Sequence, residues 1–176
     1  KNPLQHETAN VVLPAERELL VEHLRARREE GVRMNLNFLG EAILGEHEAR
    51  TRLEKYLAAL QLPEVEVVSV KISTLYSQIA PQAREHTVRA LEERLELLYR
   101  EAEHLRYVRR DGTSTPKFIY LDMEEYRDLE LTAAVFMRTL DRPALKHFSA
   151  GIALQAYIPD SYAVQRRIYD WARRRA

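Results

Sequence analysis

Hydrophobic and polar residues follow two different periods along the chain, and the two periods alternate. A two-residue period or a β-branched run, typical of strands, marks four short segments: 33–41, 65–72, 117–122 and 150–158. Apolar residues three and four positions apart, typical of amphipathic helices, mark five longer segments: 14–30, 45–62, 78–105, 124–140 and 162–175. After a first helix the chain therefore predicts a strand followed by a helix, repeated four times.

Strands that alternate with helices predict parallel pairing with right-handed crossover connections. A doubly wound nucleotide-binding sheet would carry a glycine-rich turn after its first strand, and the segment 40–45, Gly-Glu-Ala-Ile-Leu-Gly, lacks that pattern. A (β/α)8 barrel needs eight units and about 250 residues. We therefore predict an α/β fold that forms half of a TIM barrel, with an N-terminal helical segment over 1–31 and four β/α units over 32–176.

Composition narrows the possible functions. The 176 residues include 27 Lys and Arg against 27 Asp and Glu, a balance that argues against nucleic-acid binding through bulk charge. The absence of cysteine excludes thiol nucleophiles and cysteine zinc sites, and the six histidines show no metal-ligand spacing. No apolar run approaches the roughly 18 residues of a transmembrane segment. The chain starts at Lys1 and stops within a helical pattern, so we expect that both ends are truncated.

Polar side chains stand at the carboxyl ends of all four predicted strands, where parallel barrels and sheets hold their active sites. Alternation along the strands directs Glu41, Lys71 and Gln155 toward the barrel interior. Both faces of the third strand are apolar, so alternation leaves the direction of Asp122 open. Because isolated charges in a barrel mouth are costly, we expect an ion pair between Glu41 and Lys71. The alternative is that these residues are solvated caps of the strand ends.

At these residues the chain resembles the catalytic domain of proline dehydrogenase, a flavin-dependent (β/α) barrel found alone or within bifunctional proline utilization proteins. The matching segments are Asn-Phe-Leu-Gly-Glu-Ala (37–42), Ser-Val-Lys-Ile-Ser (69–73), Leu-Asp-Met-Glu-Glu (121–125) and Leu-Gln-Ala-Tyr (154–157). They occur in order, and their key residues are separated by 30, 51 and 33 positions, counted from Glu41.

The resemblance implies FAD-dependent oxidation of L-proline to pyrroline-5-carboxylate in proline catabolism, with electrons passed to a membrane quinone. It assigns Lys71 to the proline carboxylate and Glu41 to an ion pair with that lysine. It makes Asp122 the catalytic aspartate beneath the substrate, and places Met123 and Gln155 along the flavin. A cytoplasmic protein with a peripheral membrane contact through its parent is expected.

Several family features are missing from this sequence. The family carries an arginine near the flavin N5, a Lys-Gly-Ala segment on the cofactor and a Tyr-x-x-Arg-Arg motif that clamps the substrate carboxylate. These belong to later barrel strands and the final helix, beyond the fourth unit of this chain. We therefore expect the 176 residues alone to be inactive and to need the remaining half of the barrel.

Two other functional classes stay open. Lys71 on a barrel strand could form a Schiff base in a lyase or aldolase, although a neighbouring Glu41 would oppose the neutral amine that this chemistry needs. Alternatively, the domain could be a non-catalytic scaffold in which the polar residues at the strand ends serve stability alone.

Overall fold

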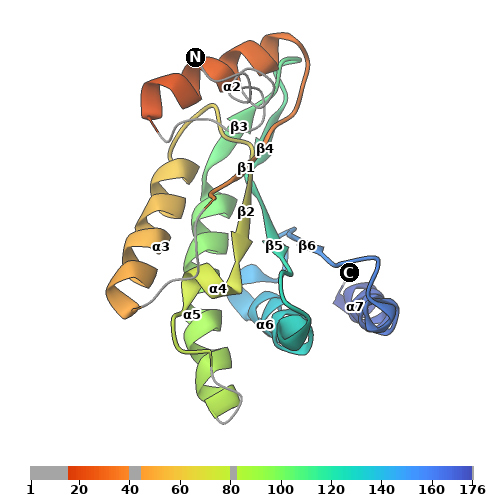
Figure 1. The fold of residues 1–176 in the computed structure, drawn as a ribbon. Coiled ribbons are helices and arrows are strands. Elements are labelled where there is room, and N and C mark those ends of the chain that lie inside the picture. Colours follow the sequence, from red (N-terminus) through yellow and green to blue (C-terminus); the bar gives the residue numbers. More distant parts are fainter. Residues whose placement is uncertain (1–15, 40–44, 80–82, 176) are drawn as a thin grey trace.

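The computed structural model describes residues 16–39, 45–79 and 83–175, and its centre is a parallel sheet (Figure 1). The sheet has four strands in the order β1-β2-β5-β6. All three neighbouring pairs are parallel. The strands are β1 (Asn35–Asn37), β2 (Val67–Lys71), β5 (Phe118–Asp122) and β6 (Gly151–Ala153). The predicted α/β fold with four parallel strands is confirmed.

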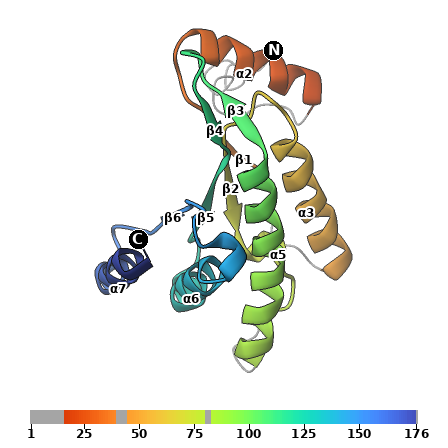
Figure 2. The same ribbon diagram turned by 180° about the vertical axis from the view of Figure 1, so that it is seen from behind.

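Helices connect and cover these strands. They are α2 (Arg17–Glu29), α3 (Glu46–Leu60), α4 (Ile72–Leu75), α5 (Arg84–His104), α6 (Leu129–Leu140) and α7 (Pro159–Arg175), with short 3-10 turns at Tyr126–Asp128 and Pro143–Leu145. In Figure 1 strands β2 and β5 lie in front of α5, and in Figure 2, seen from behind, α5 lies in front of them. Among the described helices, none is long and apolar enough to cross a membrane.

The two faces of the sheet differ in the way that alternation predicts. Val68 and Val70 of β2 and Ile119 and Leu121 of β5 are fully buried in the core shared with α3, α5 and α6. Burial of a side chain of this size contributes roughly 1.5–3 kcal/mol, so this face carries much of the stability of the fold. The opposite face carries the polar residues of the strands, and Asp122 lies on it because it alternates with Leu121.

Gly151 provides space on this second face. A Cβ atom at this position would lie 2.3 Å from the ring of Tyr120, its partner in the parallel register of β5 and β6. That ring also packs edge-on against Phe118, with the ring centroids 5.0 Å apart. The small residue that the sequence places on β6 is therefore what admits a large aromatic ring on the neighbouring strand.

Several predicted boundaries were wrong, and each error reflects short or irregular structure. The first strand covers only 35–37, and the fourth ends at Ala153 rather than at 158. The segment 106–116, which the pattern leaves without a helix or strand, forms an antiparallel hairpin of β3 (Arg106–Val108) and β4 (Ser114–Pro116). Strands of three residues are too short to show a period, so the pattern missed β3 and β4 and extended the first and fourth strands too far.

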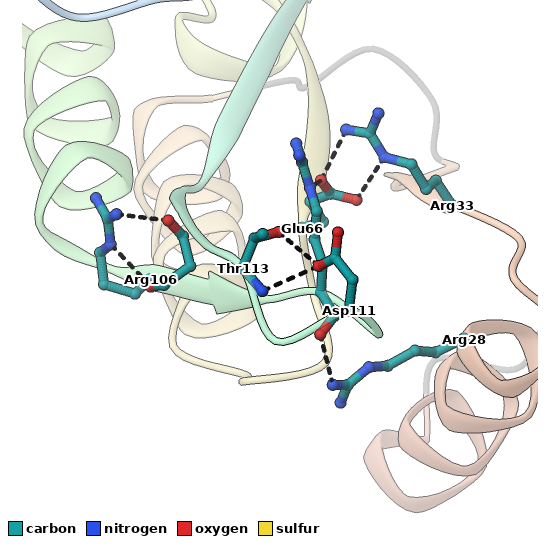
Figure 3. Close-up of polar contacts among 8 residues, drawn as sticks. Arg28, Arg33, Glu66, Arg106, Asp111 and Thr113 are labelled. Carbon is teal, nitrogen blue, oxygen red and sulfur yellow. Dashed lines mark hydrogen bonds and ion pairs between the residues drawn. The ribbon is translucent and has the colours of Figure 1, made fainter.

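A buried carboxylate at the amino end of β2 joins this hairpin to the sheet (Figure 3). Glu66 is only 4% exposed, and its two oxygens accept hydrogen bonds of 2.9 and 2.7 Å from Arg33, just before β1. Arg109 of the hairpin turn donates a third bond of 3.3 Å, and its carbonyl accepts one from Arg28 of α2. The hydrogen-bonded guanidinium groups offset the cost of burying the charge. Glu66 therefore connects three separate elements at one end of the molecule.

We predict that Glu66→Gln loosens the hairpin. The substitution removes the charge of a buried carboxylate that accepts three hydrogen bonds. It should therefore lower the local free energy of opening by about 2 kcal/mol and raise the exchange rate about thirtyfold. The measurement is hydrogen exchange at the amide of Arg109, which bonds the carbonyl of Thr113.

Glu30→Gln is the matched control, because Glu30, the residue after α2, pairs with Arg27 on the exposed surface. Such a pair contributes under about 0.5 kcal/mol. Equal exchange rates in both variants would show that the Glu66 cluster does not hold the hairpin.

Candidate functional site

Lys71 and Asp122 end neighbouring strands and lie directly beside each other in the register of β2 and β5. Both border an open depression of about 450 Å³ at the carboxyl edge of the sheet. Its lining residues are Asn37, Lys71, Asp122, Met123, Glu124, Ala153, Leu154 and Gln155. The structure thus brings together three of the strand-end residues that the sequence predicts: Lys71, Asp122 and Gln155.

The backbone of Lys71 is fixed by the helical turn that follows it. Lys71 is still extended, at φ −116° and ψ 139°, and α4 begins at the next residue. The hydroxyl of Thr74 donates a 2.8 Å hydrogen bond to the carbonyl of Lys71, and its oxygen lies 3.1 Å from the buried hydroxyl of Tyr56. This abrupt change from strand to helix places the lysine side chain at the strand end, where it is only 18% exposed.

The ion-pair partner of Lys71 in the structure is Glu124, which the sequence did not single out. The lysine Nζ lies 2.5 Å from one carboxylate oxygen of Glu124, and Ser73 donates a 2.7 Å hydrogen bond to the other. The expected partner, Glu41, falls within 40–44, outside the described residues, so that pairing stays a prediction. Glu124 lies beyond the end of β5, where strand alternation no longer indicates direction.

Asp122 is half-buried, and the surroundings of its carboxyl act in opposite directions. Burial raises the pKa of Asp122 above its ordinary value, and the charge of Glu124 adds to this effect. A hydrogen bond from Ser69 and the charge of Lys71 lower the pKa in part. Ser69 is itself oriented by Asn35 of β1, whose amide donates a 2.9 Å bond to the Ser69 hydroxyl. Residues on two strands, β1 and β2, together with Glu124 after β5, thus act on this one carboxyl group.

The two remaining predicted residues border the depression in different ways. Gln155 lies two residues beyond β6, and its amide nitrogen donates a 2.7 Å hydrogen bond to the carbonyl of Glu124. The backbone N–H of Met123 bonds the carbonyl of Ala153, whereas its side chain packs in a small apolar cluster with residues of α6 and α7. Gln155 can therefore offer an amide to a bound group, while the Met123 side chain points toward the helices.

The resulting site combines one ammonium group and one carboxylate on adjacent strands, with a second carboxylate, that of Glu124, and neutral amides beside them. Such a pair complements a small ligand that carries both a carboxylate and an ammonium group. Across residues 16–39, 45–79 and 83–175, no cluster of three His, Asp or Glu side chains could hold a metal ion.

One protein family matches the chain over most of its length. A family model described as proline dehydrogenase matches residues 20–176. No match was found among the curated proteins.

Solved structures of proline utilization A (PutA) proteins are similar to this chain over most of its length. The protein from Corynebacterium freiburgense is 38% identical, with a TM-score of 0.85, and the match covers 98% of this chain. The protein from Bdellovibrio bacteriovorus, inactivated by N-propargylglycine, is 27% identical over 90% of this chain, with a TM-score of 0.74. A mutant of the Bradyrhizobium japonicum protein is 25% identical over 97%, with a TM-score of 0.75. The chain spans only 17%, 18% and 17% of these three structures, respectively.

We predict that Ser69→Ala raises the pKa of Asp122 further, because it removes a hydrogen bond that favours the ionised carboxylate. Infrared titration should then show the protonated carboxyl band persisting to higher pH than in the wild type. Asp122→Asn, which lacks the carboxyl, identifies the band. An unchanged titration in Ser69→Ala would contradict the role assigned to this hydroxyl.

Proposed function

The chain belongs to the proline dehydrogenase family, and we propose that it forms the substrate-binding half of a barrel that oxidises L-proline to pyrroline-5-carboxylate. The observation that carries this proposal is that Lys71 and Asp122 lie side by side in the register, at the ends of adjacent parallel strands. Proline is a zwitterion at neutral pH, with a carboxylate and a ring ammonium bonded to the same α-carbon. One cation and one anion side by side match that distribution of charge.

Lys71 binds the proline carboxylate through its ammonium group, the donor best suited to a compact anion. Asp122 lies beneath the substrate and attracts the ring ammonium. Starting from the zwitterion, the oxidation removes a hydride from C5 and two protons from the ring nitrogen. The first proton leaves so that the nitrogen lone pair can form the C=N bond, and the second leaves the resulting iminium. A carboxylate whose pKa is raised by burial is suited to accept the proton that leaves nitrogen.

The residues around the depression fit one side of a flavin. Gln155 supplies a neutral amide near the site, and Ala153 of β6 adds only a methyl group to its lining. We assign Gln155 and the backbone around Met123 to the FAD edge, and Glu41 to a further contact with Lys71. Bound FAD would supply the two-electron acceptor for the hydride, and a quinone would reoxidise it.

The polar face of the sheet supports the proposal that a longer parent chain completes the site. Asn35, Tyr120 and Asp122 lie on this face, opposite the helical core. In a closed barrel such residues line the interior and its mouth. The 176 residues alone should therefore be inactive. We further propose that the parent acts in the cytoplasm, with peripheral access to a membrane acceptor.

A Schiff-base lyase is less well supported. The Lys71 ammonium is held 2.5 Å from the Glu124 carboxylate. A nucleophilic amine for imine chemistry has to be neutral and unencumbered.

The direct test is anaerobic addition of L-proline to the purified, FAD-loaded full-length parent. We expect the flavin absorbance to bleach. Lys71→Met should raise KM for proline about ten- to hundredfold, because it removes a charged hydrogen bond. Asp122→Asn should lower kcat/KM. Lys55→Met, on the exposed surface of α3, is the control and should change neither constant.

A parent protein that cannot bind FAD, or whose flavin is not reduced by proline, would overturn the proposal. If Lys71→Met and Asp122→Ala lowered stability but left ligand affinity unchanged, the scaffold interpretation would replace it. Dye reduction by the isolated 176-residue chain with proline would contradict the need for the second half of the barrel.

A further inference from the structure

Glu124 already binds the Lys71 ammonium, the group that the proposed function assigns to the substrate carboxylate. Its carboxylate lies 2.5 Å from the Lys71 ammonium, and both side chains line the same depression. A proline carboxylate that binds Lys71 therefore meets a carboxylate already present. Building on the proposed function, we propose that Glu124 is an internal competitor, which holds Lys71 in the ligand-free site and is displaced when the substrate carboxylate binds.

The contacts of Glu124 allow such an exchange without movement of the backbone. Gln155 holds the Glu124 carbonyl through a 2.7 Å hydrogen bond, so the main chain is tied to the segment after β6. The Glu124 side chain is 37% exposed, whereas Lys71 is 18% exposed. Rotation of one side chain can therefore release the carboxylate to solvent while the lysine stays in place.

The pair also explains how the two opposite charges of the site remain separate. Lys71 and Asp122 are direct neighbours in the parallel register, and a bond between them would neutralise both groups that the zwitterion needs. Within the described part of the chain, the ion pair of Lys71 is made with Glu124 instead. Ser73 orients Glu124 for this contact through its 2.7 Å hydrogen bond. Glu124 thus draws the ammonium away from Asp122 until a ligand arrives.

The test uses calorimetric titration of the oxidised, FAD-loaded parent protein with tetrahydrofuran-2-carboxylate. This compound keeps the ring and carboxylate of proline, but its ring oxygen prevents imine formation, so binding is measured without turnover. Glu124→Gln should lower Kd about two- to fivefold, the range expected for removing a partly exposed competing ion pair. The amide keeps the size of the side chain and can still accept the bond from Ser73.

Two further variants separate competition from a general charge effect. Glu124→Asp keeps the charge but shortens the side chain by one methylene, so it should lose contact with Lys71 and also tighten binding. Glu125→Gln removes one adjacent charge that pairs with Arg127, and it should leave Kd unchanged. Tetrahydrofuran-2-carboxamide, which lacks the anion, should bind Glu124→Gln and wild type equally.

Unchanged or weaker binding by Glu124→Gln would overturn the inference, because it would mean that Glu124 does not compete or that it supports Lys71 in the complex. Tighter binding by Glu124→Gln but not by Glu124→Asp would also overturn it, in favour of simple repulsion. The proposed function fails separately: if Lys71→Met bound the carboxylate as tightly as wild type, Lys71 would not be the carboxylate site at all.

Discussion

The parallel pairing of β2 with β5 is the contact on which the other features depend. It aligns five residue pairs, from Val67 with Phe118 to Lys71 with Asp122. Because side chains alternate along both strands, this one register sends Val68, Val70, Ile119 and Leu121 into the helical core and leaves the intervening residues on the other face. A shift by one residue would exchange the two sets, so the core and the site are specified by the same hydrogen bonds.

Charged groups serve different purposes at the two ends of the sheet. At the amino end, Glu66 is almost completely buried and bound by two arginines, an arrangement in which loss of either partner is costly. At the carboxyl end, Lys71 and Glu124 form a more exposed pair that can exchange partners at low cost. This division agrees with the general pattern of parallel barrels, in which one end supports stability and the other supports chemistry.

The sequence predicted those features that depend on repeated patterns. The β-branched run around Val67–Lys71 and the long stripe of α5 extend over enough residues to show a period. Gln155 was assigned to a strand end but lies past it, since β6 stops at Ala153. The hairpin, the Glu66 cluster and the Lys71–Glu124 pair could not be predicted, because they depend on contacts between distant segments or on residues beyond a strand end. Glu41 lies outside the described residues, so its predicted contact stays a prediction.

The outer strands of the sheet have a consequence for handling this chain in isolation. β1 and β6 each contain only three residues, and in the described structure each pairs with a neighbour on one side only. Unpaired backbone groups at the edge of a sheet can bond to strands of other molecules, which is how edge-to-edge association begins. Such short strands offer few hydrogen bonds to a foreign strand, and the small Gly151 contributes little apolar contact. The brevity of these strands, whose length the sequence pattern overestimated, therefore also limits self-association of the chain through the edges of its sheet.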